Sequence, residues 1–171
     1  MSTAAAKGFL EIVQWLHENR KEGCTKQAMD DAAENGHLSV VEWLHASRKE
    51  GCCEDAMDDA AANGHLEVLK FLHEHRKEGC TSAAMNLAAS NGHLEVVKWL
   101  QSNRNEGQPG TALRCAAENG RLDVVDWLYG TVRQQRRSEA CIRQAARVAK
   151  EAGHVEVACD LERKLKRQRL E

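Results

Sequence analysis

The sequence predicts an all-α fold, a solenoid of stacked helix–turn–helix hairpins. The phrase DAAENGH at 31–37 recurs in close copies along the chain, and its glycine returns every 28 residues. These glycines are Gly8, Gly36, Gly64, Gly92 and Gly120. Each 28-residue period contains two stripes of apolar residues at helical spacing. It contains no long stretch in which apolar and polar residues alternate, as they would in a β-strand. Because neither helix of one unit can bury its stripe alone, neighbouring units are expected to stack.

Residues 24–51 illustrate the first helix of each unit. Its apolar residues lie at helical spacing and are Ala28, Met29, Ala32 and Ala33. The helix is expected to end at Asn35-Gly36, because glycine readily adopts the left-handed conformation that caps a helix. The paired alanines recur in the other units and leave room for a close approach of neighbouring helices.

The second helix of the same unit follows this glycine at once. Its stripe consists of Leu38, Val41 and Leu44, widened by Val40 and Trp43. We expect this helix to end in Arg48-Lys49-Glu50-Gly51, since basic residues suit the last turn of a helix and glycine caps it.

An aromatic side chain occupies the same position of the second helix in five units. These residues are Trp15, Trp43, Phe71, Trp99 and Trp127. Their spacing places them on one stripe with Leu44, Leu72 and Leu100, so we expect them to be buried between layers. The alternative is a platform on which nucleic-acid bases stack.

The unit at 111–128, TALRCAAENGRLDVVDWL, resembles the ankyrin repeat, whose pattern is T-P-L-H-x-A-A-x-x-G-H-x-x-V-V-x-x-L-L. The matching residues are Thr111, Leu113, Ala116, Ala117, Gly120, Val124, Val125 and Leu128. The Gly-His pair also stands at 36–37, 64–65, 92–93 and 153–154. This resemblance covers nearly the whole chain. It implies that the first helices face a concave groove that grips protein partners.

The sequence departs from the family pattern in two places. The family unit spans about 33 residues, and the residues missing here follow the second helix, where the family builds a projecting β-hairpin. The loops around Gly23-Cys24, Gly51-Cys52 and Gly79-Cys80 are therefore too short for a full hairpin. The histidine of T-P-L-H is replaced by Asp30, Asp58, Asn86 and Arg114. Whether these residues make the cross-repeat hydrogen bonds of that histidine is an open question at this point. Leucine-rich repeats also span 20–29 residues, but their L-x-x-L-x-L strand signature is absent.

We expect one repeat domain over residues 1–171. Its parts are an incomplete N-terminal repeat at 1–23, repeats at 24–51, 52–79, 80–107 and 108–136, and a C-terminal capping repeat with a basic end at 137–171.

Histidine and cysteine recur seven residues apart, which invites a metal hypothesis. The pairs are His17–Cys24, His45–Cys52 and His73–Cys80. Ligands of a metal must converge, as C-x₂-C pairs do, and the sequence has no such pair. We interpret the spacing as two positions of one repeat and expect no metal.

The sequence also favours a non-enzymatic protein without a cofactor. Cys115 shows no sign of the base and oxyanion donor that a nucleophile needs. Neither a phosphate-binding loop nor a dinucleotide-binding glycine motif is present. The adjacent carboxylates of Asp30-Asp31 and Asp58-Asp59 point about 100° apart on a helix, which does not suit a catalytic dyad.

Composition sets the expected compartment and assembly. The net charge is −2, and no apolar run approaches the length of a membrane span, so we expect no membrane contact. Seven cysteines without disulfide spacing and an amino terminus without a secretory signal favour free thiols in the cytoplasm or nucleus. We expect a monomer.

Function is expected where the repeats differ while their frame stays constant. The first helices offer Asp30, Asp31, Asp58, Asp59, Asn86, Leu87, Arg114 and Cys115 on the side opposite the alanines. These side chains predict an exposed surface that is acidic, then partly apolar, then basic along the chain. We expect it to bind a protein partner that carries a basic segment. The alternative is a merely solvated face.

The end of the chain carries the opposite charge. Residues 1–130 hold 13 basic and 20 acidic residues, whereas 131–171 hold 11 basic and 6 acidic residues. The final RKLKRQRLE is therefore also compatible with nucleic-acid contact or nuclear import. Nucleic acid is the less favoured partner, since the exposed side of a capping helix also explains the basic end.

Overall fold

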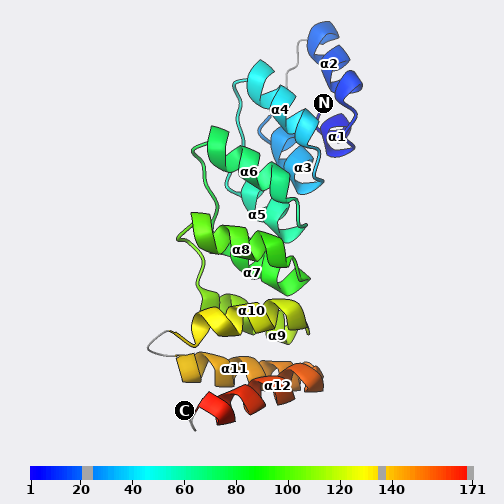
Figure 1. Ribbon diagram of the computed structural model, residues 1–171. Helices are drawn as coiled ribbons and strands as arrows, with labels where there is room; N and C mark the ends of the chain where they lie inside the picture. The colour runs from blue at the N-terminus through cyan, green and yellow to red at the C-terminus, as the bar shows by residue number, and fades with distance from the viewer. Residues whose placement is uncertain (21–24, 135–137, 169–171) are drawn as a thin grey trace. The chain divides into compact units, whose positions relative to one another are not determined.

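The computed structural model describes residues 1–20, 25–134 and 138–168. All the regular secondary structure within these ranges is α-helical, which confirms the predicted fold class (Figure 1). The chain divides into two compact units, Met1–Ala84 and Met85–Glu171. The division into repeats stays a prediction, and its expected loop at Gly23-Cys24 lies outside the described residues.

The first unit consists of helical hairpins in which a shorter helix precedes a longer one. The first helices are α1 (Ser2–Ala6), α3 (Gln27–Glu34) and α5 (Asp55–Ala62), and the second helices are α2 (Leu10–Asn19), α4 (Leu38–Ser47) and α6 (Leu66–His75). Helix α3 packs between α1 and α5, and α4 contacts both α2 and α6. First helices therefore stack on first helices, and second helices on second helices.

The second unit continues the pattern and ends in longer helices. After α7 (Ser82–Asn91), which begins at the end of the first unit, it contains α8 (Leu94–Asn103), α9 (Pro109–Glu118), α10 (Leu122–Val132), α11 (Ser138–Glu151) and α12 (Val155–Gln168). Helix α11 packs against both α9 and α12.

The predicted apolar stripes form the core. The paired alanines of the first helices are fully buried: Ala32, Ala33, Ala60, Ala61, Ala88, Ala89, Ala116 and Ala117. Small side chains let adjacent first helices approach closely, and the buried leucines at Leu44, Leu72, Leu100 and Leu128 fill the space behind them.

The turn inside each hairpin is also the contact between hairpins. Helix α3 ends at Glu34, and Gly36 follows with a φ of +75°, which confirms the predicted glycine cap. The His37 ring packs over Gly8 of the preceding hairpin, and its Nε2 lies 3.1 Å from the carbonyl oxygen of Ala6. A Cβ added to Gly36 would lie 2.5 Å from Nδ1 of His65 in the next hairpin. Glycine is required here by the backbone conformation and by the neighbouring ring.

Arginine can take over the role of this histidine. In the second unit, Arg121 stands where the other repeats have histidine, and its Nε donates to the Ser90 carbonyl oxygen at 2.8 Å. His37, His65 and His154 of the Gly-His pairs thus each pack on a glycine of the preceding repeat.

The predicted end of the second helices was wrong. Helix α4 ends at Ser47, and Arg48 is already extended, with φ −129° and ψ 155°. The Arg48 guanidinium pairs with the Glu50 carboxylate, which also accepts the backbone N–H of Lys49 at 3.0 Å. This local ion pair stabilises a turn in place of a last helical turn, and Gly51, with a φ of +77°, ends that turn. The same pairing recurs at Arg76–Glu78 and Arg104–Glu106.

These ion-pair turns are short. Segments 48–54 and 76–81 join consecutive hairpins without any strand, as the shortened period predicts. Burial, the largest single effect, raises the pKa of Glu78, but hydrogen bonds from Arg76 and from the backbone N–H groups of Glu78 and Lys77 outweigh it and lower that pKa to about 2. Glu78 is therefore ionised at neutral pH and stabilises the turn as a charged group.

The expected burial of the aromatic positions was also wrong. Trp43, Phe71, Trp99 and Trp127 are half-buried, and Trp15 is 54% exposed. The Trp43 ring lies edge-on to His17 of the preceding hairpin, with centroids 5.2 Å apart. The Phe71 ring likewise lies edge-on to His45 of the preceding second helix, so these two rings pack on a neighbouring helix and still keep partial exposure to solvent.

We expect Gly36→Ala to lower the free energy of unfolding by about 2 kcal/mol, because alanine is strained at positive φ and its methyl group meets the His65 ring. Gly130→Ala is the matched control: Gly130 lies inside α10 and has no neighbour within 4 Å of the added Cβ. Alanine should stabilise that helix by about 0.5–1 kcal/mol. Urea unfolding of both variants measures the difference, and equal effects would contradict the close contact at Gly36.

Candidate partner-binding surface

Two of the eight predicted surface residues are buried. Asp30 is 6% exposed and Asp58 is 5% exposed, so their expected exposure was wrong. Asp30 accepts the backbone N–H of Cys53 at 3.0 Å and the Cys53 thiol at 2.9 Å. Asp58 accepts the backbone N–H of Thr81 at 2.9 Å and the Thr81 hydroxyl at 2.5 Å. Each carboxylate links its helix to the segment that leads into the next first helix, and that segment covers it.

These bonds answer the question left open by the replaced histidine for two of the four repeats. Asp30 and Asp58 still make a cross-repeat hydrogen bond at that position, each accepting from the following repeat. By contrast, the buried Oδ1 of Asn86 has no hydrogen-bond partner among the described residues, and Arg114 lies near Glu118 of its own helix. Burial, followed by the hydrogen bond to Asp30, raises the pKa of the Cys53 thiol to about 12. Burial raises the pKa of Cys52 to about 11. Both thiols are therefore protonated at neutral pH, a state that is poorly nucleophilic.

The neighbouring aspartates remain accessible and belong to a larger acidic patch. We define this acidic patch as Asp31, Glu34, Asp55 and Asp59, which lie on α3 and α5. Asp31 and Asp59 are half-exposed, and Glu34 and Asp55 are exposed. Asp31 accepts a hydrogen bond from the Gln27 side chain at 2.6 Å. Glu34, Asp55 and Asp59 form no ion pair with any described residue, so the patch presents negative charge to solvent.

The pKa of Asp59 reflects the electrostatics of the acidic patch. Burial first, and then the negative charges of Glu34, Asp55, Asp58 and Asp30, raise the pKa of Asp59. The ionised form of Asp59 is thus disfavoured by partial burial and also by the like charges around it. A cation placed beside Asp59 would relieve this repulsion.

The predicted residues of the second unit make a different surface. Leu87 on α7 is 41% exposed, and Asn86 beside it is half-buried. Arg114 on α9 lies 3.6 Å from Glu118, a loose ion pair at most, and Cys115 is a half-exposed free thiol. These residues offer an apolar side chain, a guanidinium and a thiol.

Arg114 also lines a pocket that sequence reasoning missed. The pocket has a volume of about 280 Å³, and its wall includes Thr111, Cys141 and Gln144. Cys141 and Gln144 lie on α11, about thirty residues further along the chain. Only the packing of α11 on α9 brings them to Arg114, so no local sequence signal could have placed them there.

Within 1–20, 25–134 and 138–168, no three or more His, Cys, Asp or Glu side chains are grouped to hold a metal ion. Cys24, one member of the His–Cys pattern, lies outside these ranges. No helix in the same part of the chain is both long enough and apolar enough to cross a membrane.

Family models match most of the chain. A model described as ankyrin repeats in three copies matches residues 57–137, and one described as ankyrin repeats in many copies matches 1–45 and 29–73. The chain belongs to the ankyrin repeat family. Ankyrin repeats are generally protein–protein interaction modules, and proteins of the family are typically non-enzymatic scaffolds. No curated protein matches this ankyrin repeat chain.

We expect the two members of one Asp-Asp pair to differ sharply in their effect on stability. Asp58→Ala leaves the Thr81 N–H and hydroxyl without their acceptor, so it should lower the free energy of unfolding by about 2 kcal/mol. Asp59→Ala, one residue away, removes a carboxylate that repels its neighbours and should change stability by less than about 0.5 kcal/mol. Urea unfolding distinguishes the two, and a small effect for both variants would show that the Asp58 bonds are dispensable.

Proposed function

We propose that this ankyrin repeat protein is a non-enzymatic scaffold that binds a protein partner carrying a basic segment. The binding surface is the solvent-facing side of the first helices. The observation that carries the proposal is the acidic patch, four carboxylates that are exposed or half-exposed on α3 and α5. Burial first, and then the neighbouring negative charges, raise the pKa of Asp59 within it. Of the eight residues expected from the sequence, Asp31, Asp59, Leu87, Arg114 and Cys115 remain candidates for direct contact, with Asn86 at their edge.

A basic segment complements the acidic patch for a physical reason. Lysine or arginine side chains of a partner would neutralise carboxylates that the fold holds together, and charge-assisted hydrogen bonds would add to this gain. Surface charges of this kind mainly raise the association rate and select the partner. Their effect is screened by salt, because the Debye length falls to about 8 Å at physiological ionic strength.

The second unit supplies contacts of another kind. Leu87 gives the partner an apolar contact, which adds affinity in proportion to the area removed from water. The Arg114 guanidinium, beside its pocket, can donate to carbonyl or carboxylate oxygens of a bound chain. A single charge gradient along one continuous groove remains a prediction.

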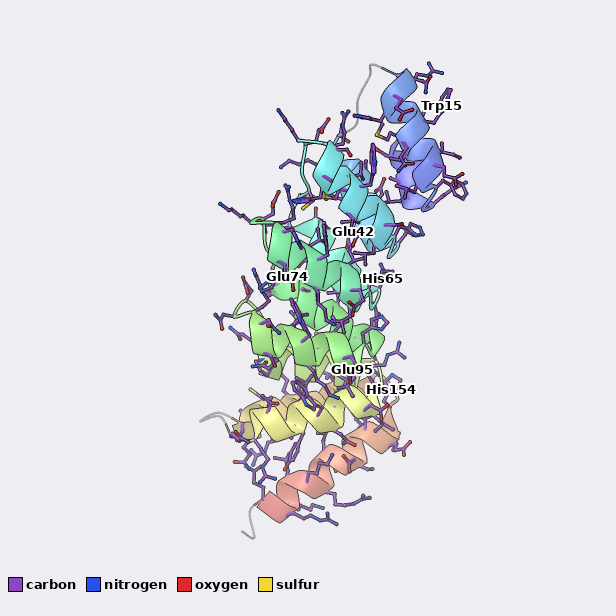
Figure 2. The ribbon with its side chains drawn as sticks, turned by 45° about the horizontal axis from the view of Figure 1, so that its top comes forward. Trp15, Glu42, His65, Glu74, Glu95 and His154 are labelled. Carbon is purple, nitrogen blue, oxygen red and sulfur yellow. The ribbon has the colours of Figure 1, made fainter. Side chains whose placement is uncertain are left out.

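The acidic patch is tested by a quantitative pull-down from lysate of the native cells. We expect the variant Asp31→Lys/Asp59→Lys to retain about tenfold less of a specific protein partner than the wild type. The matched control, Glu42→Lys/Glu74→Lys, makes the same change of charge at exposed positions of α4 and α6 (Figure 2). Circular dichroism establishes that both variants are folded.

The control should retain the partner at the wild-type level. Equal retention by all three proteins would mean that the acidic patch is only a solvated face. Equal loss in both variants would mean that overall charge, rather than this surface, determines binding.

A second candidate function rests on the basic end of the chain. Arg133 and Arg167 line a surface pocket of about 500 Å³ between α10 and α12, together with Tyr129 and Lys164. Lys164 is paired with Asp126 and Asp160, so the two arginines supply the accessible positive charge. This arrangement is compatible with a phosphate of a nucleic acid.

Substitutions test nucleic-acid contact by the basic end better than a deletion does. Deleting residues 162–171 would also remove Leu165, which is part of the buried core. If the basic end contacts nucleic acid, Arg133→Gln/Arg167→Gln should weaken binding of a fluorescent oligonucleotide and reduce the steepness of its salt dependence. Anisotropy titrations at several salt concentrations measure both quantities. No binding by the wild type at low salt would eliminate this function.

A further inference from the structure

The largest exposed apolar side chains of the first unit lie together on α2. Phe9 precedes this helix directly and is 51% exposed, Ile12 is 48% exposed and Trp15 is 54% exposed. They follow one another at intervals of three residues, so they lie on one side of the helix. Figure 2 shows Trp15 on α2, apart from Glu42, His65 and Glu74 of the same unit. Contiguous exposed apolar side chains of this size are typical of an interaction surface.

The sister repeats show that this side of the second helix is a packing surface. His37, Val40 and Trp43 occupy the same three positions in the next hairpin. His37 packs on the preceding hairpin, Val40 is fully buried, and the Trp43 ring contacts His17 of α2. The α2 surface therefore has the composition of a packed layer, yet no described residue covers it.

The other end of the repeat series has the opposite character. Glu162, Arg163 and Lys166 of α12 are exposed, which gives the last helix the polar outer side of a capping repeat. Val155 is the one large apolar side chain of α12 that is exposed among its described residues, so α12 offers a second copy of α2 no apolar cluster. The largest cluster of exposed apolar side chains that a second copy offers is its own α2.

The α2 surface is complementary to itself. Ile12 lies at its centre, with an aromatic residue three positions away on each side. If two copies of α2 pack antiparallel about a two-fold axis at Ile12, Phe9 of one copy meets Trp15 of the other. Lys7, which follows α1, and Glu18, in the last turn of α2, stand on either side of Ile12 along the chain, and both are exposed. In the antiparallel arrangement Lys7 of each copy approaches Glu18 of the other. Attraction between these charges occurs twice, as an isologous interface requires.

We propose that the protein forms a homodimer through antiparallel packing of α2 on α2 of a second copy. The contact spans Phe9 to Trp15, about 9 Å of helix, so the dimer is small and reversible rather than obligate. Each copy keeps its acidic patch, which lies on α3 and α5 rather than α2. The dimer departs from the monomer expected from the sequence, and it would present two patches to a partner.

Sedimentation velocity of the full chain from about 1 to about 500 μM tests the proposal. The wild type should shift from monomer to dimer with concentration. Ile12→Glu places two carboxylates at the two-fold axis and should raise the dissociation constant at least about tenfold. Val155→Glu, at an exposed apolar residue of α12, is the matched control and should leave the equilibrium unchanged.

The Lys7–Glu18 pair gives a second test, which is specific to the antiparallel orientation of the two α2 helices. Glu18→Lys alone brings two lysines together at each end of the contact and should raise the dissociation constant about threefold, as expected for exposed ion pairs. Lys7→Glu/Glu18→Lys exchanges the charges and should restore the wild-type value. Dimerisation without this rescue would overturn the antiparallel arrangement.

A wild type that stays monomeric over the whole range would overturn the dimer. In that case a copy of residues 24–56 can be joined in register ahead of the chain, since Met1 occupies the repeat position of Met29 and Met57. If the extended chain has a higher Tm than the wild type, and Ile12→Glu abolishes this rise, the α2 surface packs against a further hairpin of the repeat array.

Discussion

Consecutive hairpins are joined by a side chain, most often a histidine ring, that packs on a glycine. His37 covers Gly8 and reaches the Ala6 carbonyl, so the end of one first helix is bonded to the start of the following second helix. The contact needs a backbone with positive φ and no side chain at the glycine, and a ring of suitable size 29 residues later. Each repeat touches only its neighbours, so the stability of the array depends on the quality of these contacts. Residues outside them can differ from repeat to repeat.

The Asp-Asp pairs show how closely structure and surface chemistry are combined. Adjacent residues on a helix point about 100° apart, so Asp58 reaches the next repeat while Asp59 faces solvent. The two roles are not independent, because the buried carboxylates of Asp30 and Asp58 also contribute to the raised pKa of Asp59. The charges that link the repeats therefore add to the negative potential of the surface proposed to bind a partner.

Most of the fold could be predicted from the sequence, because the 28-residue period, the alanine stripes and the glycine caps are local patterns repeated several times. The predictions were wrong where contacts between distant or non-helical segments determine the burial of a side chain or the end of a helix. Asp30 lies opposite the alanines on its own helix, but the segment at Cys53 covers it. The end of α4 depends on a side-chain ion pair between Arg48 and Glu50 that helix propensity does not describe. Glu34 and Asp55 were missed as site residues because only two positions of each helix were compared.

The central claim is that the exposed carboxylates of the first helices contact the partner. Zero-length carbodiimide crosslinking of the complex tests it most directly, since it joins a carboxylate only to an amine in contact with it. The account predicts that mass spectrometry will find partner lysines joined to Asp31, Glu34, Asp55 or Asp59. Crosslinks confined to the exposed acids of the second helices, Glu42, Glu67 and Glu74, would contradict it.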